Sequence, residues 1–481
     1  MDDFSFFWHD YETFGRVPRR DRPSQFAGIR TDADLNEVGD PVMLYCQPAP
    51  DTLPDPEACL LTGITPQTCL ANGVPEHRFA DAVEAALAKP GTVGVGYNSI
   101  RFDDEVTRHL FWRNLIDPYA REWQNRCGRW DLLDVVRCTY ALRPEGIAWP
   151  THPDGKPSFK LEDLARANGL LHEAAHDALS DVRATIALAR LIKSAQPRLW
   201  DFCLKLHRKD AVAAEIGVAQ QAGQPFLHIS GMYGTERGGL ALVWPLAPHP
   251  KNKNELIVWD LATDPAELQG LGVATLRERI FTRADALPEG VARLPIKTIH
   301  LNKSPIVIAN LRTLSPAMAA RWGIDMAQGL ARVERAAQQA QALAGLWPAV
   351  FERPASAGAV DVDEDLYGGF VGNDDRRTLQ RLLGLTPEQL ATKRADFADP
   401  RLGELLFRYR ARNFPETLSP PEQAQWLAHR ADRLHDGVGG GLTLEAFFER
   451  IDELGEEADE RGQEILGALV DYATEIAPER D

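Results

Sequence analysis

Residues 6–15 constrain the fold most, because they have the pattern of a buried strand that carries two carboxylates near its end. The stretch begins with three apolar residues, reaches Asp10 and Glu12, and ends at Gly15. Residues two apart in a strand point to the same face, so the two carboxylates are expected to project together. In an apolar sheet they resist ionisation unless a divalent cation is bound. A strand that simply ends in solvent is the plainer alternative.

The composition is that of a globular protein with several domains. The 481 residues are 44% hydrophobic and 26% charged, and this length predicts roughly two to four domains. No apolar run reaches the roughly 18 residues of a membrane span, and the acidic N-terminus is unlike a signal peptide. Six cysteines without a Cys-x-x-Cys pair indicate reduced thiols and no zinc site. We therefore expect a cytoplasmic protein with no membrane association.

The formal net charge of −17 argues at first against a nucleic-acid partner, because phosphate binding needs a local density of cations. Much of this charge comes from the acidic C-terminal third, whereas arginine and lysine are frequent between Arg101 and Arg208. Net charge governs solubility and long-range steering rather than the surface of one groove. A locally basic face is therefore compatible with this composition.

The first 196 residues have the pattern of an α/β domain. Strands are predicted at residues 4–12, 25–31 and 41–47, as an antiparallel meander, and at 92–98. Helices are predicted at residues 76–89, 103–115, 130–142, 161–168 and 177–194. Thr65, which precedes a proline, is a predicted N-cap of a further helix. Strands with alternating helices indicate an α/β layer architecture.

Two further domains are predicted, at residues 197–348 and 349–481. Short β-like runs broken by glycines indicate a small barrel: 226–230, 240–245, 256–261, 296–301 and 305–309. The pattern then becomes helical: 316–343, 374–383, 387–397, 402–412, 420–433 and 442 to the end. Residues 348–358 resemble a linker, and Thr386 before Pro387 is another predicted N-cap.

Two more clusters supply acids that could join the first pair. Asn98 follows a predicted strand, and Asp103 begins the next helix, where the positive helix end favours an acid in any case. His176 precedes a helix whose predicted N-cap is Asp177. Asp181 lies where the core-facing side of that helix begins, and a carboxylate there is costly unless something binds it.

Together these residues form a set of four acids and one histidine: Asp10, Glu12, Asp103, Asp181 and His176. Carboxylates are suitable ligands for Mg²⁺ or Mn²⁺. Two such ions can clamp the attacking and leaving oxygens in phosphoryl transfer. A neutral histidine can take a proton from the attacking water, which is typically worth about 10²–10⁴-fold in rate. The set favours a metal site over a plain strand end.

The three motifs in this order resemble those of the DEDDh 3′–5′ exonucleases: Asp-x-Glu at Asp10, Asn-x(4)-Asp at Asn98 and His-x(4)-Asp at His176. The match is closer still to the bacterial exonuclease I family. It is carried by residues 9–15, 60–66, 95–107, 129–135, 140–147, 175–178, 230–232 and 409–415. The resemblance spans essentially the whole chain.

This resemblance implies an RNase H-like exonuclease domain at 1–196, an SH3-like β-barrel at 197–348 and an all-α extension at 349–481. In that family the three parts form a C-shaped clamp around single-stranded DNA. The implied activity is processive 3′–5′ hydrolysis to 5′-mononucleotides with two Mg²⁺ ions, which Mn²⁺ can replace. The family also implies a monomer that serves DNA repair and recombination.

The resemblance assigns roles to individual residues as well. Asp10, Glu12 and Asp181 would hold metal, Asp103 would complete the acid set, and His176 would be the general base. Glu12 and Lys160 would contact the substrate. Lys160 stands where the family has an arginine, and a lysine keeps the charge but loses the bidentate fork.

Four residues near the acids suit single-strand binding on their own terms: Arg108, Tyr119, Trp123 and Arg137. Bases stack on aromatic rings with little sequence preference, while cations follow the phosphates. The spacing of Tyr119 and Trp123 is equally consistent with two core residues of a helix.

A protein partner is implied by the resemblance too, namely the acidic C-terminal tail of single-stranded DNA-binding protein. Arg143 matches a basic residue of that docking site, and a basic pocket suits an acidic tail. The second half of the site would lie near residues 312–316. Leu314, Ser315 and Pro316 stand there in place of a family arginine.

Two other functions stay open at this point. The same chemistry could act on RNA or short oligonucleotides, although the barrel and the helical extension suit a long captured strand. The chain could also be an inactive scaffold that binds single-stranded DNA, but all five catalytic positions are filled.

Overall fold

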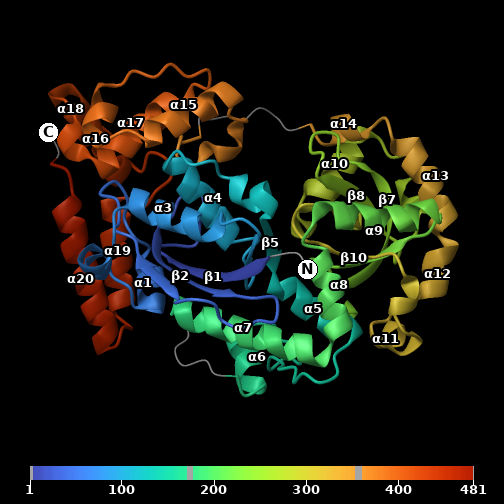
Figure 1. Ribbon diagram of the computed structural model, residues 1–481. Helices are drawn as coiled ribbons and strands as arrows, with labels where there is room; N and C mark the ends of the chain where they lie inside the picture. Colours follow the sequence, from blue (N-terminus) through green and yellow to red (C-terminus); the bar gives the residue numbers. More distant parts are fainter. Residues whose placement is uncertain (1–3, 171–176, 353–359, 480–481) are drawn as a thin grey trace. The chain divides into compact units, whose positions relative to one another are not determined.

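The computed structural model describes residues 4–170, 177–352 and 360–479 (Figure 1). The chain falls into two compact units. The first comprises residues 1–128, 172–183 and 358–481, and the second comprises 129–171 and 184–357. No helix within the described residues is long and apolar enough to cross a membrane. All six cysteines are buried free thiols.

A mixed five-stranded sheet carries the first acids, in the order β3-β2-β1-β4-β5. β1 (Ser5–Thr13) runs antiparallel to β2 (Pro23–Thr31) and parallel to β4 (Thr92–Gly96). β3 (Val42–Tyr45) pairs antiparallel with β2, which confirms the predicted meander. β1 therefore lies in the middle of the sheet.

β5 (Gly128–Asp131) was not predicted, because residues 130–142 were assigned entirely to a helix. The strand runs directly into α5 (Leu132–Leu142), and Asp131 caps that helix by accepting a hydrogen bond from the Leu133 amide at 3.0 Å. All four residues of β5 are buried. A short buried strand cannot be separated from an apolar helix by periodicity alone.

β1 is held in place by apolar packing at its start. Phe6 and Trp8 are fully buried, and the indole of Trp8 donates a hydrogen bond to Thr31 Oγ1 at 2.9 Å. Phe7, on the other face, joins a core that is closed by α3 (Glu76–Leu87) and α4 (Asp103–Arg113). Fully burying such side chains stabilises the fold by roughly 1.5–3 kcal/mol each. The acids that follow are thus attached to a rigid strand.

The first unit also contains the C-terminal helices. Its shorter early helices are α1 (Pro56–Thr62) and α2 (Pro66–Asn72), and Thr65 caps α2 as predicted. The C-terminal helices are α15 (Asn373–Leu383), α16 (Pro387–Thr392), α17 (Arg401–Asn413), α18 (Pro420–Asp436), α19 (Leu444–Gly455) and α20 (Glu460–Ile476). Thr386 forms a capping box with Gln389, which confirms the second predicted N-cap.

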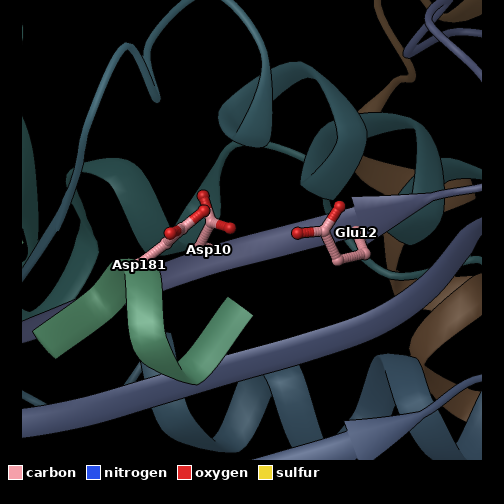
Figure 2. Close-up of side chains that lie close together, drawn as sticks. All are labelled: Asp10, Glu12 and Asp181. Carbon is pink, nitrogen blue, oxygen red and sulfur yellow. The ribbon is translucent and has the colours of Figure 1, made fainter. Parts of the chain in front are cut away.

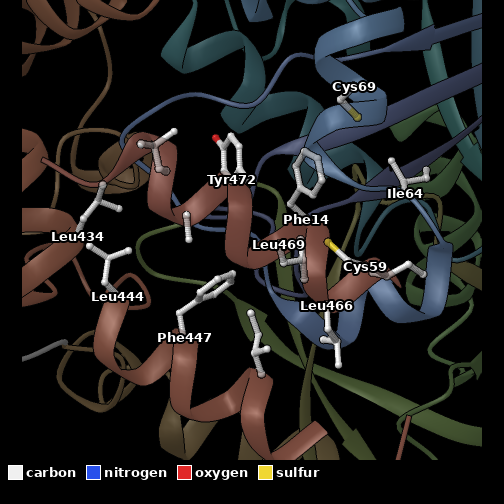
Figure 3. Close-up of a cluster of buried hydrophobic side chains, with 14 residues drawn as sticks. Phe14, Cys59, Ile64, Cys69, Leu434, Leu444, Phe447, Leu466, Leu469 and Tyr472 are labelled. Carbon is white, nitrogen blue, oxygen red and sulfur yellow. The ribbon is translucent and has the colours of Figure 1, made fainter. Parts of the chain in front are cut away.

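One hydrophobic cluster joins the two ends of the sequence (Figure 3). Phe14, Cys59, Ile64 and Cys69 lie near the N-terminal sheet, and they pack against Leu434, Leu444, Phe447, Leu466, Leu469 and Tyr472 of the C-terminal helices. The buried Phe14 follows directly after β1. This core therefore supports the end of the strand that carries Glu12.

The second unit contains an antiparallel five-stranded sheet, in the order β10-β6-β7-β8-β9. Its strands are β6 (Phe226–Ile229), β7 (Leu240–Pro248), β8 (Glu255–Asp260), β9 (Ile296–His300) and β10 (Ile306–Ile308), as predicted. α8 (Pro197–Lys205), α9 (Lys209–Gln221) and α10 (Val273–Phe281) were not predicted. α6 (Leu161–Ala167) was predicted, and α14 (Trp347–Val350) is short.

The prediction of one helix over residues 316–343 is wrong. This segment forms three helices: α11 (Pro316–Arg321), α12 (Met326–Ala331) and α13 (Val333–Leu343). Gly323 has a positive φ of 60°, which interrupts the helical backbone, and Asp325 caps α12 by accepting from the Gln328 amide. Glycine adopts this conformation at little cost, so the break follows from its position.

A buried ion-pair network also ties the two ends of the chain together in the first unit. Arg412 of α17 contacts Asp51 Oδ2 at 2.7 Å and Asp363 Oδ2 at 2.5 Å. Burial alone would raise the pKa of Asp51, but the positive charges of Arg412 and its neighbours hold that pKa well below its usual range. The same charges lower the pKa of Asp363, so both carboxylates stay ionised, and Arg412 is the closest partner of each.

Substitution of Arg412→Met should lower the free energy of unfolding by about 3–5 kcal/mol, because it removes the closest positive partner of two buried carboxylates. Urea denaturation followed by circular dichroism measures the change. Arg377→Met is the matched control, since its ion pair with Asp374 is exposed and is worth about 0–1 kcal/mol. Equal losses in the two variants would contradict this role of the network.

Candidate active site

Three carboxylates converge at the centre of the first sheet (Figure 2). Asp10 and Glu12 project from β1, and Asp181 projects from the first turn of α7 (Ala178–Ala195). One oxygen of each lies within 4.8 Å of an oxygen of the other two. The predicted projection of Asp10 and Glu12 to one face is confirmed, and the predicted approach of Asp181 is confirmed with it.

Asp103 lies against the same strand. It is the first residue of α4, its side chain is buried, and its Oδ1 accepts a hydrogen bond from the Tyr11 amide at 3.1 Å. Tyr11 stands between Asp10 and Glu12, so the carboxylate of Asp103 is held beside both. The β1 backbone and the start of α4 thus position the fourth acid.

α7 is attached to the site by its first residues. The Ala178 amide donates to Gln25 Oε1 at 3.3 Å, and Gln25 is paired with Glu12 in the β1–β2 register. Asp177 accepts from the Ser180 amide at 3.0 Å, so its predicted capping role is confirmed. Gln25 was not predicted as a site residue, since a buried glutamine within a strand carries no motif. His176 lies outside the described residues.

The electrostatics of the site favour a cation. Burial, and then the charges of Asp103, Glu12 and Asp181, raise the pKa of Asp10 well above its usual range. Burial and the charge of Asp181 raise the pKa of Glu12 to about 8. Carboxylates that repel one another in this way share a preference for a hard divalent ion. The donor set consists of oxygens alone, which fits Mg²⁺ or Mn²⁺ better than a softer metal.

The predicted DNA-binding residues of the first unit differ in their surroundings. Arg108 is buried, and its guanidinium contacts both carboxylate oxygens of Glu122 at 2.7 and 2.9 Å. It also lies 5.2 Å from the centre of the Tyr119 ring, which packs against a neighbouring apolar cluster. Trp123 is 67% exposed, so the core alternative is wrong for this residue.

The remaining predicted contacts lie in the second unit. Arg137 forms an ion pair with Asp134 at 2.8 Å, and a side chain at Gly231 would meet its guanidinium at 2.8 Å. Lys160 directly precedes α6 and is largely exposed. Arg143 donates to the Thr313 carbonyl at 3.1 Å, so it reaches the predicted second half of the partner site. The binding roles of these residues stay predictions.

The fold and the acid set define a metal-dependent exonuclease with two further domains. A model of the Exonuclease family matches residues 7–189, the Exonuclease I SH3-like domain matches 207–353, and the Exonuclease I C-terminal domain matches 360–476. The chain therefore has an exonuclease domain, an SH3-like domain and a helical C-terminal domain, as predicted.

The chain is 44% identical to exodeoxyribonuclease I of Escherichia coli K12 over 474 residues, which cover 98% of each chain. It is also 44% identical to exodeoxyribonuclease I of Haemophilus influenzae over 480 residues, or 99% of each. It belongs to the exodeoxyribonuclease I family and is an enzyme of that kind, a processive 3′–5′ exonuclease of single-stranded DNA.

Solved structures agree with this assignment. Exonuclease I from Methylocaldum szegediense superimposes with a TM-score of 0.91 at 47% identity, covering 98% of this chain and 99% of that one. E. coli exonuclease I in complex with a dA16 oligonucleotide gives 0.92 at 44% identity, covering 99% and 100%. A structure described as SSB/Exonuclease I with the inhibitor CFAM gives 0.89 at 43% identity, covering 98% and 100%.

The raised pKa of Glu12 predicts how stability depends on pH in the absence of metal. Its folded-state pKa of about 8 exceeds its ordinary value of 4.5. The folded state therefore binds the proton more tightly, and stability falls as pH rises from 4.5 to 8. Glu12→Gln removes this loss. In EDTA it should melt at a higher temperature than the wild type at pH 8, but not at pH 4.5.

Melting curves between pH 4.5 and 8.5, with EDTA or Mg²⁺, measure this difference. The exposed Glu449→Gln is the matched control and should follow the wild type throughout. Excess Mg²⁺ should restore the stability of the wild type at pH 8. A wild type whose stability in EDTA does not change over this range would contradict the proposed charge repulsion.

Proposed function

We propose that Asp10, Glu12 and Asp181 hold two Mg²⁺ ions, which Mn²⁺ can replace, and that Asp103 completes the acid set. The observation that carries this proposal is the convergence of the three carboxylates within 4.8 Å. Their raised pKa values support it, because a bound cation would relieve the repulsion that raises them. The acids then remain ionised at neutral pH.

The reaction is the attack of water on the phosphorus of the 3′-terminal phosphodiester, with cleavage of the P–O3′ bond and release of a 5′-mononucleotide. The bound ions would activate the water and stabilise the charge on the leaving oxygen. His176 would take the proton from the water as general base, a role that rests on its place in the sequence motif. Glu12 would also contact the terminal nucleotide.

We propose that the single strand is bound by aromatic and basic residues. The exposed indole of Trp123 is suited to stack on a base. Lys160 has an exposed ammonium group suited to a phosphate. Arg108, Tyr119 and Arg137 complete the proposed set, although Arg108 would have to share its guanidinium with Glu122. The dA16 complex of E. coli exonuclease I supports a single-stranded DNA substrate.

Further proposals concern the organisation and setting of the enzyme. We propose domain boundaries near residues 196 and 348, which lie close to the intervals between the matched family models. We also propose a monomer that acts in the cytoplasm in DNA repair and recombination. Six buried free thiols are consistent with a reducing compartment.

Asp10→Asn should lower the rate of hydrolysis by more than about 100-fold. Loss of a residue that only supports a metal ligand costs up to about 100-fold, and loss of a ligand itself should cost more. The assay uses 5′-labelled DNA and RNA oligonucleotides, single-stranded and duplex, with Mg²⁺ or EDTA. Wild-type enzyme should shorten only single-stranded DNA, and only with Mg²⁺. Asp471 is exposed on α20. Asp471→Asn is therefore the control for the loss of a carboxylate outside the acid set, and it should hydrolyse DNA at the wild-type rate.

The alternatives give different results in this assay. Preference for RNA would keep the acid site but change the substrate. Binding of DNA by the wild type without hydrolysis would favour a scaffold. Wild-type rates in Asp10→Asn would overturn the assignment of the metal ligands.

We also propose that the second unit binds the acidic C-terminal tail of single-stranded DNA-binding protein through Arg143. The structure described as SSB/Exonuclease I supports such a partner. Arg143 is half-buried beside the Thr313 carbonyl, so its charge is fixed near residues 312–316. Leu314, Ser315 and Pro316 stand where the family has a further arginine of this site.

Arg143→Glu should weaken binding of an acidic tail peptide by about 10-fold or more, because reversal of the charge replaces attraction with repulsion. Fluorescence anisotropy with a labelled peptide measures this affinity. Arg166→Glu, an exposed arginine on α6, should bind the peptide as the wild type does. Equal affinities in all three proteins would exclude Arg143 from the docking site.

A further inference from the structure

A buried ion pair lies next to the acid that begins α4. Arg121 Nη2 contacts Asp104 Oδ1 at 2.5 Å, and both side chains are 1% exposed. Asp104 is the second residue of α4, and Arg121 belongs to the short 3₁₀ helix Ala120–Glu122. Neither residue belongs to the set of four acids, yet the pair fixes the end of the helix on which Asp103 is placed.

The contacts of Asp103 and Asp104 divide between two sides of the helix end. Successive helical residues point about 100° apart. Asp103 therefore accepts from the Tyr11 amide, while Asp104 turns to Arg121. Thr107, one turn on, makes a 3.0 Å hydrogen bond with the Tyr11 hydroxyl and donates to the Asp103 carbonyl at 2.8 Å. A shift of this helix end would move Asp103 away from β1.

The sheet leaves room for this arginine. A Cβ at Gly94 of β4 would lie 3.3 Å from Arg121 Nη1 and 3.3 Å from Leu87 Cδ2, which is tighter than ordinary contact. His9 of β1 lies nearby, since its Nε2 would be 3.6 Å from the same Cβ. Burial, and then the charge of Arg121, lower the pKa of His9 to about 4. The guanidinium is thus packed against β4, close to His9, the residue before Asp10.

The pair is an expensive way to stabilise a core. Nε and Nη1 of Arg121 have no hydrogen-bonding partner among the described residues. A buried ion pair with incomplete hydrogen bonding is often no more stabilising than apolar residues of similar size. What it supplies instead is a fixed contact, because separating two buried charges of opposite sign leaves each without its partner at a large cost in free energy.

We propose that Arg121 is a positioning residue for the exonuclease reaction. Its ion pair with Asp104 fixes the start of α4, so that Asp103 stays hydrogen-bonded to Tyr11 between the carboxylates of Asp10 and Glu12. The proposal rests on the proposed function, in which these acids bind metal.

The test compares Arg121→Met with the double variant Arg121→Met/Asp104→Leu. Binding of Mn²⁺ is measured by titration calorimetry without DNA, and kcat and KM are measured with a single-stranded oligonucleotide. Loss of an outer-shell partner typically costs about 10–100-fold in metal affinity or activity. We expect weaker Mn²⁺ binding and lower kcat by this amount in both variants, with KM for DNA unchanged. Arg121→Lys should recover part of the loss, because it keeps the positive charge that pairs with Asp104.

The double variant separates positioning from folding. It removes both charges, so its melting temperature should return toward that of the wild type, while its Mn²⁺ affinity stays low. If Arg121→Met fails to fold, the double variant alone decides. Wild-type Mn²⁺ affinity and kcat in a folded variant would overturn the proposal and leave the pair a purely structural one.

Arg113→Met is the matched control. Arg113 lies at the other end of α4, and its Nη2 forms a buried ion pair with Glu76 at 2.8 Å. Its loss should lower the melting temperature but leave Mn²⁺ affinity unchanged; a matching loss of affinity would overturn a specific role for Arg121. Asp10→Asn is measured in parallel. If it binds Mn²⁺ and hydrolyses DNA like the wild type, the proposed function fails, whatever the Arg121 variants show.

Discussion

Repulsion between carboxylates that are buried together is the constraint on which the rest of this structure depends. Asp10 and Glu12 cannot separate, because strand geometry places them on one face. Asp181 and Asp103 approach them from two helices, and each adds to the negative charge. The protein accepts this cost in the largely buried middle strand of the sheet, where the acids cannot move apart to relieve it. Bound metal is the natural counter-charge.

The elements around β1 offset part of this cost before any ion binds. α4 begins at Asp103, and Asp181 lies in the first turn of α7, so each acid lies near the positive end of a helix dipole. The Tyr11 amide donates to Asp103, which satisfies one carboxylate oxygen without a cation. Ions and backbone thus share the stabilisation of the site. The packing of Phe14 against the C-terminal helices extends the same rigidity to the end of β1.

Much of the site was predictable from local sequence because its geometry is local. The two-residue spacing of Asp10 and Glu12 indicates a shared face, and the helix that begins before Asp181 was recognised by its cap and apolar stripe. The contacts that were missed join residues that no hydrophobic periodicity and no sequence motif connects. Arg121 contacts Asp104, which is 17 residues away. Gln25 lies beside Glu12 only because the register of β1 and β2 pairs the two residues.

In the fold, too, the elements with a clear local pattern were predicted and the others were not. The strands of both sheets with clear alternation were predicted. β5 was merged with the helix that follows it, because both are apolar and buried. The helix predicted over residues 316–343 is interrupted at Gly323, which takes a positive φ. The break was missed because the apolar pattern continues on both sides of this glycine. Trp123 could not be assigned to core or surface by spacing alone, and only the fold leaves it exposed.

The most direct test of the metal site is a crystal structure of the enzyme with Mn²⁺ and a single-stranded oligonucleotide, using the anomalous signal of manganese. Two anomalous peaks about 3.5–4 Å apart, within coordinating distance of Asp10, Glu12 and Asp181, are the predicted result. Manganese bound elsewhere, with these carboxylates in contact only with water or protein, would contradict the assignment of this acid cluster as the catalytic metal site.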